Sequence, residues 1–192
     1  MQLFSALQFE TGFSGSEAKK AVDPISQAGL ELPLLARNSP YVLKSPWYCQ
    51  QLDDALRRRA LKVKLAIIPM RPINDAAESR RRVYAEAQAA GLVPEAHPGT
   101  TWLGERHRNQ EEALLQQFYE GLMALVRHRV PVKLLNFPRL AQDEAYLFTE
   151  LQELLEEHGV TRQDFAMAFA ETSRPELIHD FGSTLMQQRA IK

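Results

Sequence analysis

The sequence predicts an α/β domain with a mainly parallel sheet flanked by helices. Three observations predict it. Short apolar segments alternate with long amphipathic ones, each apolar segment leads into a helix-forming one, and 45% of the 192 residues are apolar, which is enough for a buried core. We expect a single α/β domain over residues 1–192, with an irregular N-terminal segment at 1–40 and the patterned core at 41–192.

The N-terminal segment is poor in periodic pattern. Residues 11–40 contain three glycines and three prolines among polar residues, a mixture that interrupts long elements. We expect short helices joined by turns there. "YVLK" at 41–44 then predicts a short buried strand, which ends at Ser45-Pro46 because proline lacks a backbone donor.

The next elements alternate between helix and strand. We expect a helix at about 47–59, and a second buried strand at 63–68, "VKLAII", bounded by Pro69. A helix follows at about 74–90, with Asn74 or Asp75 as N-cap and Gly91 as its end.

A long irregular segment at 92–108 separates the elements above from those that follow, and such segments often carry function. Apolar periodicity predicts a helix at 109–128. The expected elements after it are a strand at 131–137, a helix at about 142–158 ended by Gly159, and a helix at about 161–170 with Thr161 as N-cap.

The composition limits the classes of partner and the cellular compartment that we expect. Lys and Arg total 23 against 24 Asp and Glu, so no global charge attracts nucleic acid or an anionic membrane, and we expect neither as a partner. The single cysteine, Cys49, suits a reducing compartment. No leader or membrane span is recognisable, so we expect a cytoplasmic protein; the oligomeric state is not predicted.

Ligands of parallel sheets bind beyond the carboxyl ends of the strands. That rule selects residues 44–46, 71–79 and 136–139. In the second of these, Arg71 stands at the end of a strand and Ser79 on the first turns of the next helix. A guanidinium beside a helix N-terminus can hold a phosphate. The alternative is that Arg71 pairs with Asp75 or Glu78 and that Ser79 is an ordinary helical residue.

Three quoted segments in this order resemble a known family. They are "YVLKSPWYCQQL", "VKLAIIPMRPINDAAESRRR" and "VKLLNFPRLAQDEAYLFTELQELLEEHGV". Together they resemble the sulfotransferases that use 3′-phosphoadenosine-5′-phosphosulfate (PAPS), especially bacterial sulfotransferase-like proteins. In that family an arginine after a strand and a serine eight residues later bind the nucleotide 3′-phosphate, and Arg71 and Ser79 match this pair. Asn136, Leu140 and Asp143 match a later element loosely.

The resemblance implies a fold related to P-loop nucleotide-binding proteins, PAPS as co-substrate, and sulfuryl transfer to a hydroxyl or amine of an unknown acceptor. It implies that a cation such as Lys44 neutralises the developing charge, and that no metal is needed. We expect no metal site, since the histidines show no ligand spacing with carboxylates.

The sequence departs from the family at its phosphate-binding loop. The nearest candidate is Ser14-Gly15-Ser16, but Phe13 stands where a cation is usual and Pro24 would interrupt the helix. The alternative for this stretch is a plain surface turn. Three interpretations therefore stay open: an active sulfotransferase, a non-catalytic α/β binding module with a residual 3′-phosphate site, or a degenerate or truncated sulfotransferase.

Several other residues have two interpretations. Arg80, Arg81 and Arg82 point about 100° apart on a helix, so we expect them to be solvated or paired rather than one patch. His97 or His107 could serve as general base, against simple exposure. Cys49 is expected to be a packed residue rather than a nucleophile. The aromatic residues Trp47, Tyr48 and Trp102 could either stack against a bound acceptor or adenine or pack in the core.

Overall fold

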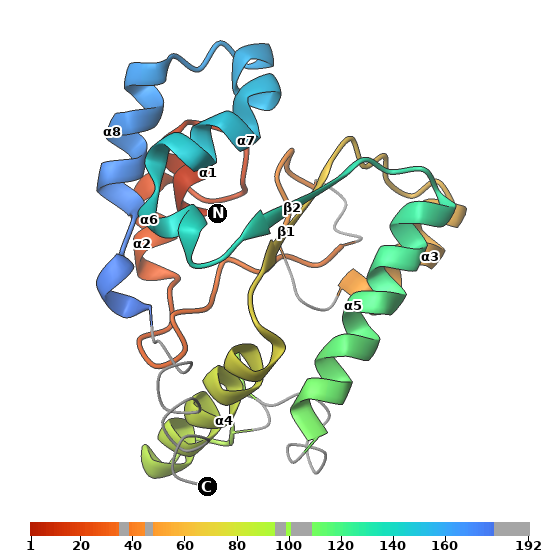
Figure 1. The fold of residues 1–192 in the computed structure, drawn as a ribbon, viewed down its shortest axis with the longest axis vertical. Helices are drawn as coiled ribbons and strands as arrows, with labels where there is room; N and C mark the ends of the chain where they lie inside the picture. The colour runs from red at the N-terminus through yellow and green to blue at the C-terminus, as the bar shows by residue number, and fades with distance from the viewer. Residues whose placement is uncertain (35–38, 45–47, 95–98, 101–108, 179–192) are drawn as a thin grey trace, which may run out of the picture. The chain divides into compact units, whose positions relative to one another are not determined.

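The structure is a computed structural model that describes residues 1–34, 39–44, 48–94, 99–100 and 109–178 (Figure 1). The chain divides into two compact units. The first contains Met1–Val22, Gly29–Met70 and Gln117–Pro175, and the second contains Asp23–Ala28, Arg71–Gln116 and Glu176–Lys192.

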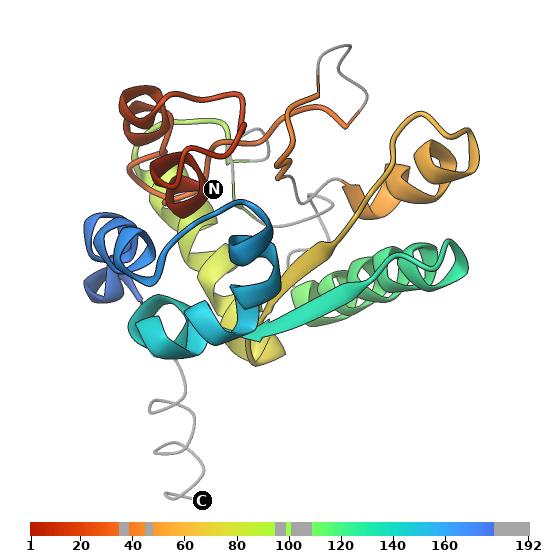
Figure 2. The same ribbon diagram turned by 90° about the horizontal axis from the view of Figure 1, so that it is seen from above.

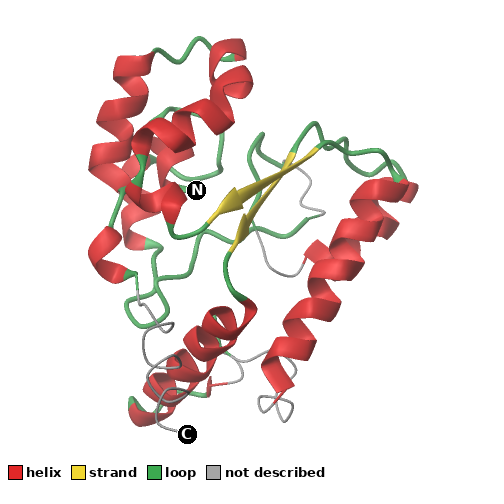
Figure 3. Cartoon of the chain, in the orientation of Figure 1, coloured by secondary structure: helices red, strands yellow, loops and turns green. Residues whose placement is uncertain are grey.

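The described part of the chain is α/β, with a small two-stranded parallel sheet and mostly helices (Figure 3). Strands β1 (Ala66–Met70) and β2 (Val132–Asn136) pair in parallel, with Ala66 opposite Val132 and Met70 opposite Asn136. The predicted α/β class and the parallel pairing are confirmed at this coarse level.

The predicted end of the first of these strands at Pro69 is wrong, because β1 continues through Pro69 to Met70. The reason lies in which way the backbone groups point. Ala66 N–H donates to Pro131 O and Met70 O accepts from Phe137 N–H, so residues 66, 68 and 70 face β2 and Pro69 faces away. The missing N–H of Pro69 therefore costs no hydrogen bond of the ladder.

The strand predicted at 41–44 is also wrong. The chain there forms bends and irregular structure, and its backbone groups bond to other loops. Val42 N–H donates to Glu10 O at 2.9 Å, and Lys44 O accepts from Leu32 N–H at 3.1 Å. An apolar run can be buried without a strand partner, and a short run does not distinguish the two cases.

The helices follow the predicted order. Those of the first part of the chain are α1 (Gln2–Ala6), α2 (Gly15–Lys20), α3 (Tyr48–Arg57) and α4 (Ile73–Ala89). Those of the second part are α5 (Gln110–Arg127), α6 (Arg139–Gln142), α7 (Glu144–Glu157), α8 (Arg162–Thr172) and the 3₁₀ turn Pro175–Leu177. None of the helices in these described ranges is both long and apolar enough to cross a bilayer.

Local capping explains most helix ends. Thr161 caps α8 in a capping box with Asp164, as predicted, and Gly91 and Gly159 adopt positive φ values of 71° and 67° beyond their helices. The predicted N-cap of α4 is wrong, because the helix begins earlier and its N-cap is Pro72. Proline fits there because the first helical N–H groups lack intrahelical partners.

The core of the first unit lies on both faces of the sheet. On one face, Leu135 and Ile67 pack with α7 and α8 around Phe165, which is fully buried. On the other face, Ile68 and Val132 pack against Leu125 and its neighbours from α3 and α5. Figure 2 shows α3 and α5 side by side next to the strands.

Candidate functional site

The junction between β1 and α4 has the features of an anion-binding helix start. β1 ends at Met70, and Pro72 is the N-cap of the 17-residue helix α4. Pro72 supplies no side-chain cap, and the first intrahelical bond runs from Ala76 N–H to Pro72 O at 3.1 Å. The N–H groups of the first turn and the partial positive charge of the helix are therefore not neutralised by an N-cap side chain.

Arg71 brings a positive charge to this junction. Its side chain is half-buried and its Nε atom is buried. Burial lowers the pKa of Arg71, while the negative charge of Asp75 acts in the opposite direction. A guanidinium stays protonated under these conditions, so the protein keeps a partly desolvated cation at the start of α4.

Ser79 lies on the same face of α4 as Asp75, because residues four apart in a helix lie above one another. Its side chain is half-buried. Arg71 and Ser79 belong to the same compact unit. Arg71 directly precedes the N-cap of α4, and Ser79 is the seventh residue of the helix, so their joint role as phosphate ligands stays a prediction.

Glu78, one of the two alternative partners of Arg71, is engaged by another arginine. Glu78 accepts from Arg81 Nη1 at 2.6 Å, and Arg81 also donates to both carboxylate oxygens of Glu111. These bonds, chiefly those from Glu111, raise the pKa of Arg81. Asp75 acts on Arg71 through its charge.

The other arginines of α4 are engaged in separate contacts. Arg80 Nη1 donates to Thr100 O at 2.9 Å, and Arg82 Nε donates to Glu86 Oε1 at 2.6 Å. Together with the bonds of Arg81, these contacts confirm the expectation of paired or solvated side chains. The three arginines do not form one basic patch.

Lys44 is placed in the first unit, whereas Arg71 and Ser79 belong to the second. Its Nζ donates to Gly29 O at 2.6 Å and pairs with Glu31 Oε1 at 2.8 Å. The structure thus gives Lys44 a structural task in its own unit, and its catalytic task stays a prediction.

The Ser14-Gly15-Ser16 stretch is not built as a phosphate-binding loop. Helix α1, rather than a strand, precedes it, and α2 begins at Gly15 with a capping box. Ser14 Oγ accepts from Glu17 N–H, and Glu17 Oε2 accepts from Ser14 N–H at 2.8 Å. Ser14-Gly15-Ser16 is therefore the capped start of a short helix, in which the Glu17 carboxylate accepts from the N-cap N–H.

Residues at the end of β2 also hold local structure together. Asn136 N–H donates to the Tyr146 hydroxyl at 2.8 Å. Asp143 is the N-cap of α7, accepts from Tyr146 N–H at 2.9 Å and pairs with Arg139. Asn136 thus ends β2 and Asp143 begins α7, while Leu140 of the short helix α6 packs against the core.

Several candidates of the sequence lie outside the described residues. They are Trp47, His97, Trp102 and His107. In the described ranges, no group of three or more His, Cys, Asp and Glu side chains is arranged to hold a metal ion.

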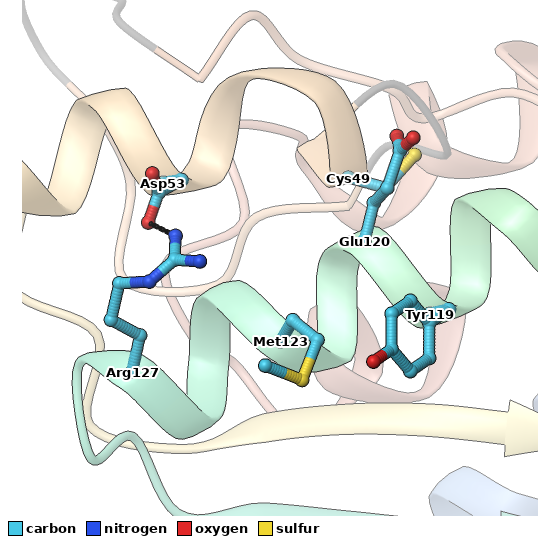
Figure 4. A pocket seen from close by; sticks show the side chains of 6 residues that line it. All are labelled: Cys49, Asp53, Tyr119, Glu120, Met123 and Arg127. Atoms are coloured by element: carbon cyan, nitrogen blue, oxygen red, sulfur yellow. Dashed lines mark hydrogen bonds and ion pairs between the residues drawn. The ribbon is translucent and has the colours of Figure 1, made fainter.

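A second feature was not predicted. A hollow of about 400 Å³ opens between α3 and α5 in the first unit (Figure 4). It is lined by Cys49, Asp53, Tyr119, Glu120, Met123 and Arg127. No sequence motif marks this hollow, because its residues come from two helices that meet only in the folded chain.

One wall of the hollow is ionic. Asp53 Oδ1 accepts from Arg127 at 2.7 Å and lies 3.0 Å from His128 Nε2. These hydrogen bonds, that of Arg127 first, lower the pKa of Asp53. Cys49 in helix α3 is half-buried and lines the hollow, so its expected packing role stays a prediction.

Comparison of the chain with protein-family models, with curated proteins and with solved structures finds no match.

Proposed function

We propose that this chain binds the 3′-phosphate of an adenosine nucleotide at the start of α4, as the PAPS-dependent sulfotransferases do. The observation that carries the proposal is the partly buried Arg71 cation at a helix start without a side-chain cap. A cation that has already lost part of its hydration gains most from a fixed anion. Ser79 adds a hydroxyl donor eight residues along the chain.

We further propose that the nucleotide is PAPS and that the chain transfers its sulfuryl group. The acceptor oxygen or nitrogen attacks sulfur in line, the bond from sulfur to the 5′-phosphate oxygen breaks, and adenosine 3′,5′-bisphosphate leaves. The acceptor proton passes to a base or to water. The contribution of the chain is position and charge, with Arg71 and Ser79 holding the donor. Under this proposal the α/β fold is of the P-loop NTPase-like type.

A second candidate is a non-catalytic module that keeps only the 3′-phosphate site. Two observations favour it. The Ser14 region has its own carboxylate at the helix start, and Lys44 is engaged by Glu31. The two candidates share the nucleotide site and differ in turnover.

Calorimetric titration with adenosine 3′,5′-bisphosphate tests the shared site. We expect binding that adenosine 5′-monophosphate, which lacks the 3′-phosphate, does not reproduce. Arg71→Ala should weaken it at least roughly tenfold and Ser79→Ala by a smaller factor, because a charge-assisted bond contributes about 1.5–3 kcal/mol and a neutral one about half of that. Arg82→Ala is the matched control, since Arg82 is exposed and pairs with Glu86.

Absence of binding at millimolar bisphosphate would overturn the proposal. If binding is present, incubation with PAPS and a panel of phenols, alcohols and amines separates the two candidates. Release of bisphosphate that depends on an acceptor supports the transferase, and binding without release supports the module.

A further inference from the structure

Helix α5 has an apolar stripe that its own fold leaves exposed. Leu115, Tyr119 and Val126 are 61%, 62% and 59% exposed, and Met123 is 37% exposed. Their spacing of four, four and three residues places them on one face of the helix. The opposite face carries the buried residues Ala113, Ala124 and Leu125. Among the described residues α5 is thus apolar on two faces; one packs in the core, and the other is largely exposed, with Tyr119 and Met123 at the edge of the hollow beside α3.

The two ends of the stripe carry opposite charges. Glu112 is exposed one turn before Leu115, and Arg129 is exposed just beyond the helix. Neither takes part in an ion pair among the described residues. The neighbouring charges are already engaged, because Glu111 pairs with Arg81 and Arg127 pairs with Asp53.

The stripe is symmetric about its centre. Glu112 and Arg129 are equally far from a point between residues 120 and 121, and so are Leu115 and Val126. Tyr119 and Met123 are centred on Gly121, about half a residue from that point. A twofold axis through the point would set Glu112 against Arg129 and Leu115 against Val126 of a second copy, with Tyr119 and Met123 within about one residue of each other.

We propose that the α5 stripe is an interface between two copies of this chain, with their α5 helices packed antiparallel about a twofold axis. Leu115 contacts Val126 of the second copy, and Tyr119 contacts Met123. At each end Glu112 meets Arg129, so the charges that specify the antiparallel direction are opposite in sign. A parallel pairing would set like charges together.

The strength of the dimer follows from its size. An 18-residue helix is about 27 Å long at 1.5 Å per residue, and a single helix face lies at or below the small end of the range of roughly 1,200–2,000 Å² for stable interfaces. We therefore expect a concentration-dependent dimer with a dissociation constant on the order of micromolar. This interface does not depend on the nucleotide site.

Sedimentation velocity of the whole chain, without nucleotide, tests the proposal over about 1–200 µM, a range that brackets the expected constant. The wild type should shift from monomer to dimer within this range. Tyr119→Lys should remain monomeric, since it sets a charge in the centre of the stripe. Met167→Lys, at an apolar position of α8 that is 58% exposed, is the matched control and should dimerise like the wild type.

Charge reversal tests the register. Glu112→Lys and Arg129→Glu should each weaken the dimer roughly tenfold, because each substitution occurs twice in a symmetric dimer. The double variant should return to within about threefold of the wild type, since opposite charges again face each other. Circular dichroism of each variant verifies folding. A wild type that is monomeric throughout, a dimer insensitive to Tyr119→Lys, or a double variant without rescue would overturn the proposal.

Discussion

Asp75 is an acidic neighbour of the Arg71 guanidinium. Its carboxylate acts on the Arg71 guanidinium through its charge, so an incoming phosphate has to compete with it. We expect Asp75→Asn to tighten the binding of adenosine 3′,5′-bisphosphate several-fold, because the amide keeps the shape and removes the competing charge. Calorimetry at low ionic strength measures the change. Weaker binding in this variant would show that Asp75 positions Arg71 rather than competing for it.

Asp143 makes stability depend on pH. The backbone N–H of Tyr146, and secondly Arg139, hold the pKa of Asp143 below its ordinary value. A carboxyl with a lowered folded pKa contributes stability above its unfolded pKa of about 3.9, and this contribution is lost as the pH falls through the folded value. We expect the urea midpoint of Asp143→Asn to fall less than that of the wild type below about pH 4. Asparagine retains the N-cap, so an equal dependence of the urea midpoint on pH in both proteins would contradict this assignment.

At the scale of elements, α8 depends on one buried ring. Phe165 is fully buried and its ring lies 5.3 Å from that of Phe148 and 6.3 Å from that of Phe169. We expect Phe165→Ala to lower the free energy of unfolding by about 3–5 kcal/mol, through lost burial and a cavity. Met167→Ala, on the exposed side of the same helix, should change it by less than about 0.5 kcal/mol. Urea unfolding followed by circular dichroism measures both.

The N-cap of α8 is a separate contribution. Thr161 Oγ1 accepts from Asp164 N–H at 3.1 Å. Thr161→Ala should therefore reduce the free energy of unfolding by about 1 kcal/mol, and Thr161→Ser should retain most of the stabilisation by the cap. An alanine variant as stable as the serine variant would show that the cap contributes nothing.

The helices could be predicted from the sequence because their signals are local. Thr161, Gly91 and Gly159 act within one turn of the helix they delimit. The strands could be predicted only in part, since a strand needs a partner that is remote in sequence. The Val42 N–H donates to the Glu10 carbonyl and not to a neighbouring strand. Pro69 is tolerated in β1 because its nitrogen faces away from β2.

At the scale of the whole molecule, the proposed ligand should stabilise the fold by mass action. Ligand at 100 times its dissociation constant adds about 2.7 kcal/mol. We expect adenosine 3′,5′-bisphosphate to raise the midpoint of thermal unfolding in a scanning calorimeter, and Arg71→Ala to abolish the rise. Arg71 and Ser79 belong to one of the two compact units, so if the units unfold separately, only the transition of that unit should move. An equal rise in the variant would place the ligand elsewhere.

The candidate sites differ in how far the sequence could predict them. Arg71 and Ser79 are eight residues apart in one continuous segment, so the family resemblance together with this spacing could predict a site there. The hollow between α3 and α5 joins Cys49 and Asp53 to Tyr119 and Met123, and the stripe of α5 is visible only once Leu125 is known to be buried and Val126 exposed. An amphipathic pattern predicts a helix, but not which of two apolar faces the core uses.

The parallel pairing of β1 and β2 also has a consequence in time. All of α4 and α5 stands between the two strands, so β1 leaves the ribosome well before its partner exists. At roughly 5–20 residues per second, the segment from Arg71 to Pro131 occupies several seconds of synthesis. During that interval Ile67 and Ile68 have no strand to pair with, and contacts this remote in sequence form slowly. The pairing of β1 with β2 is therefore complete only after Asn136 has been added.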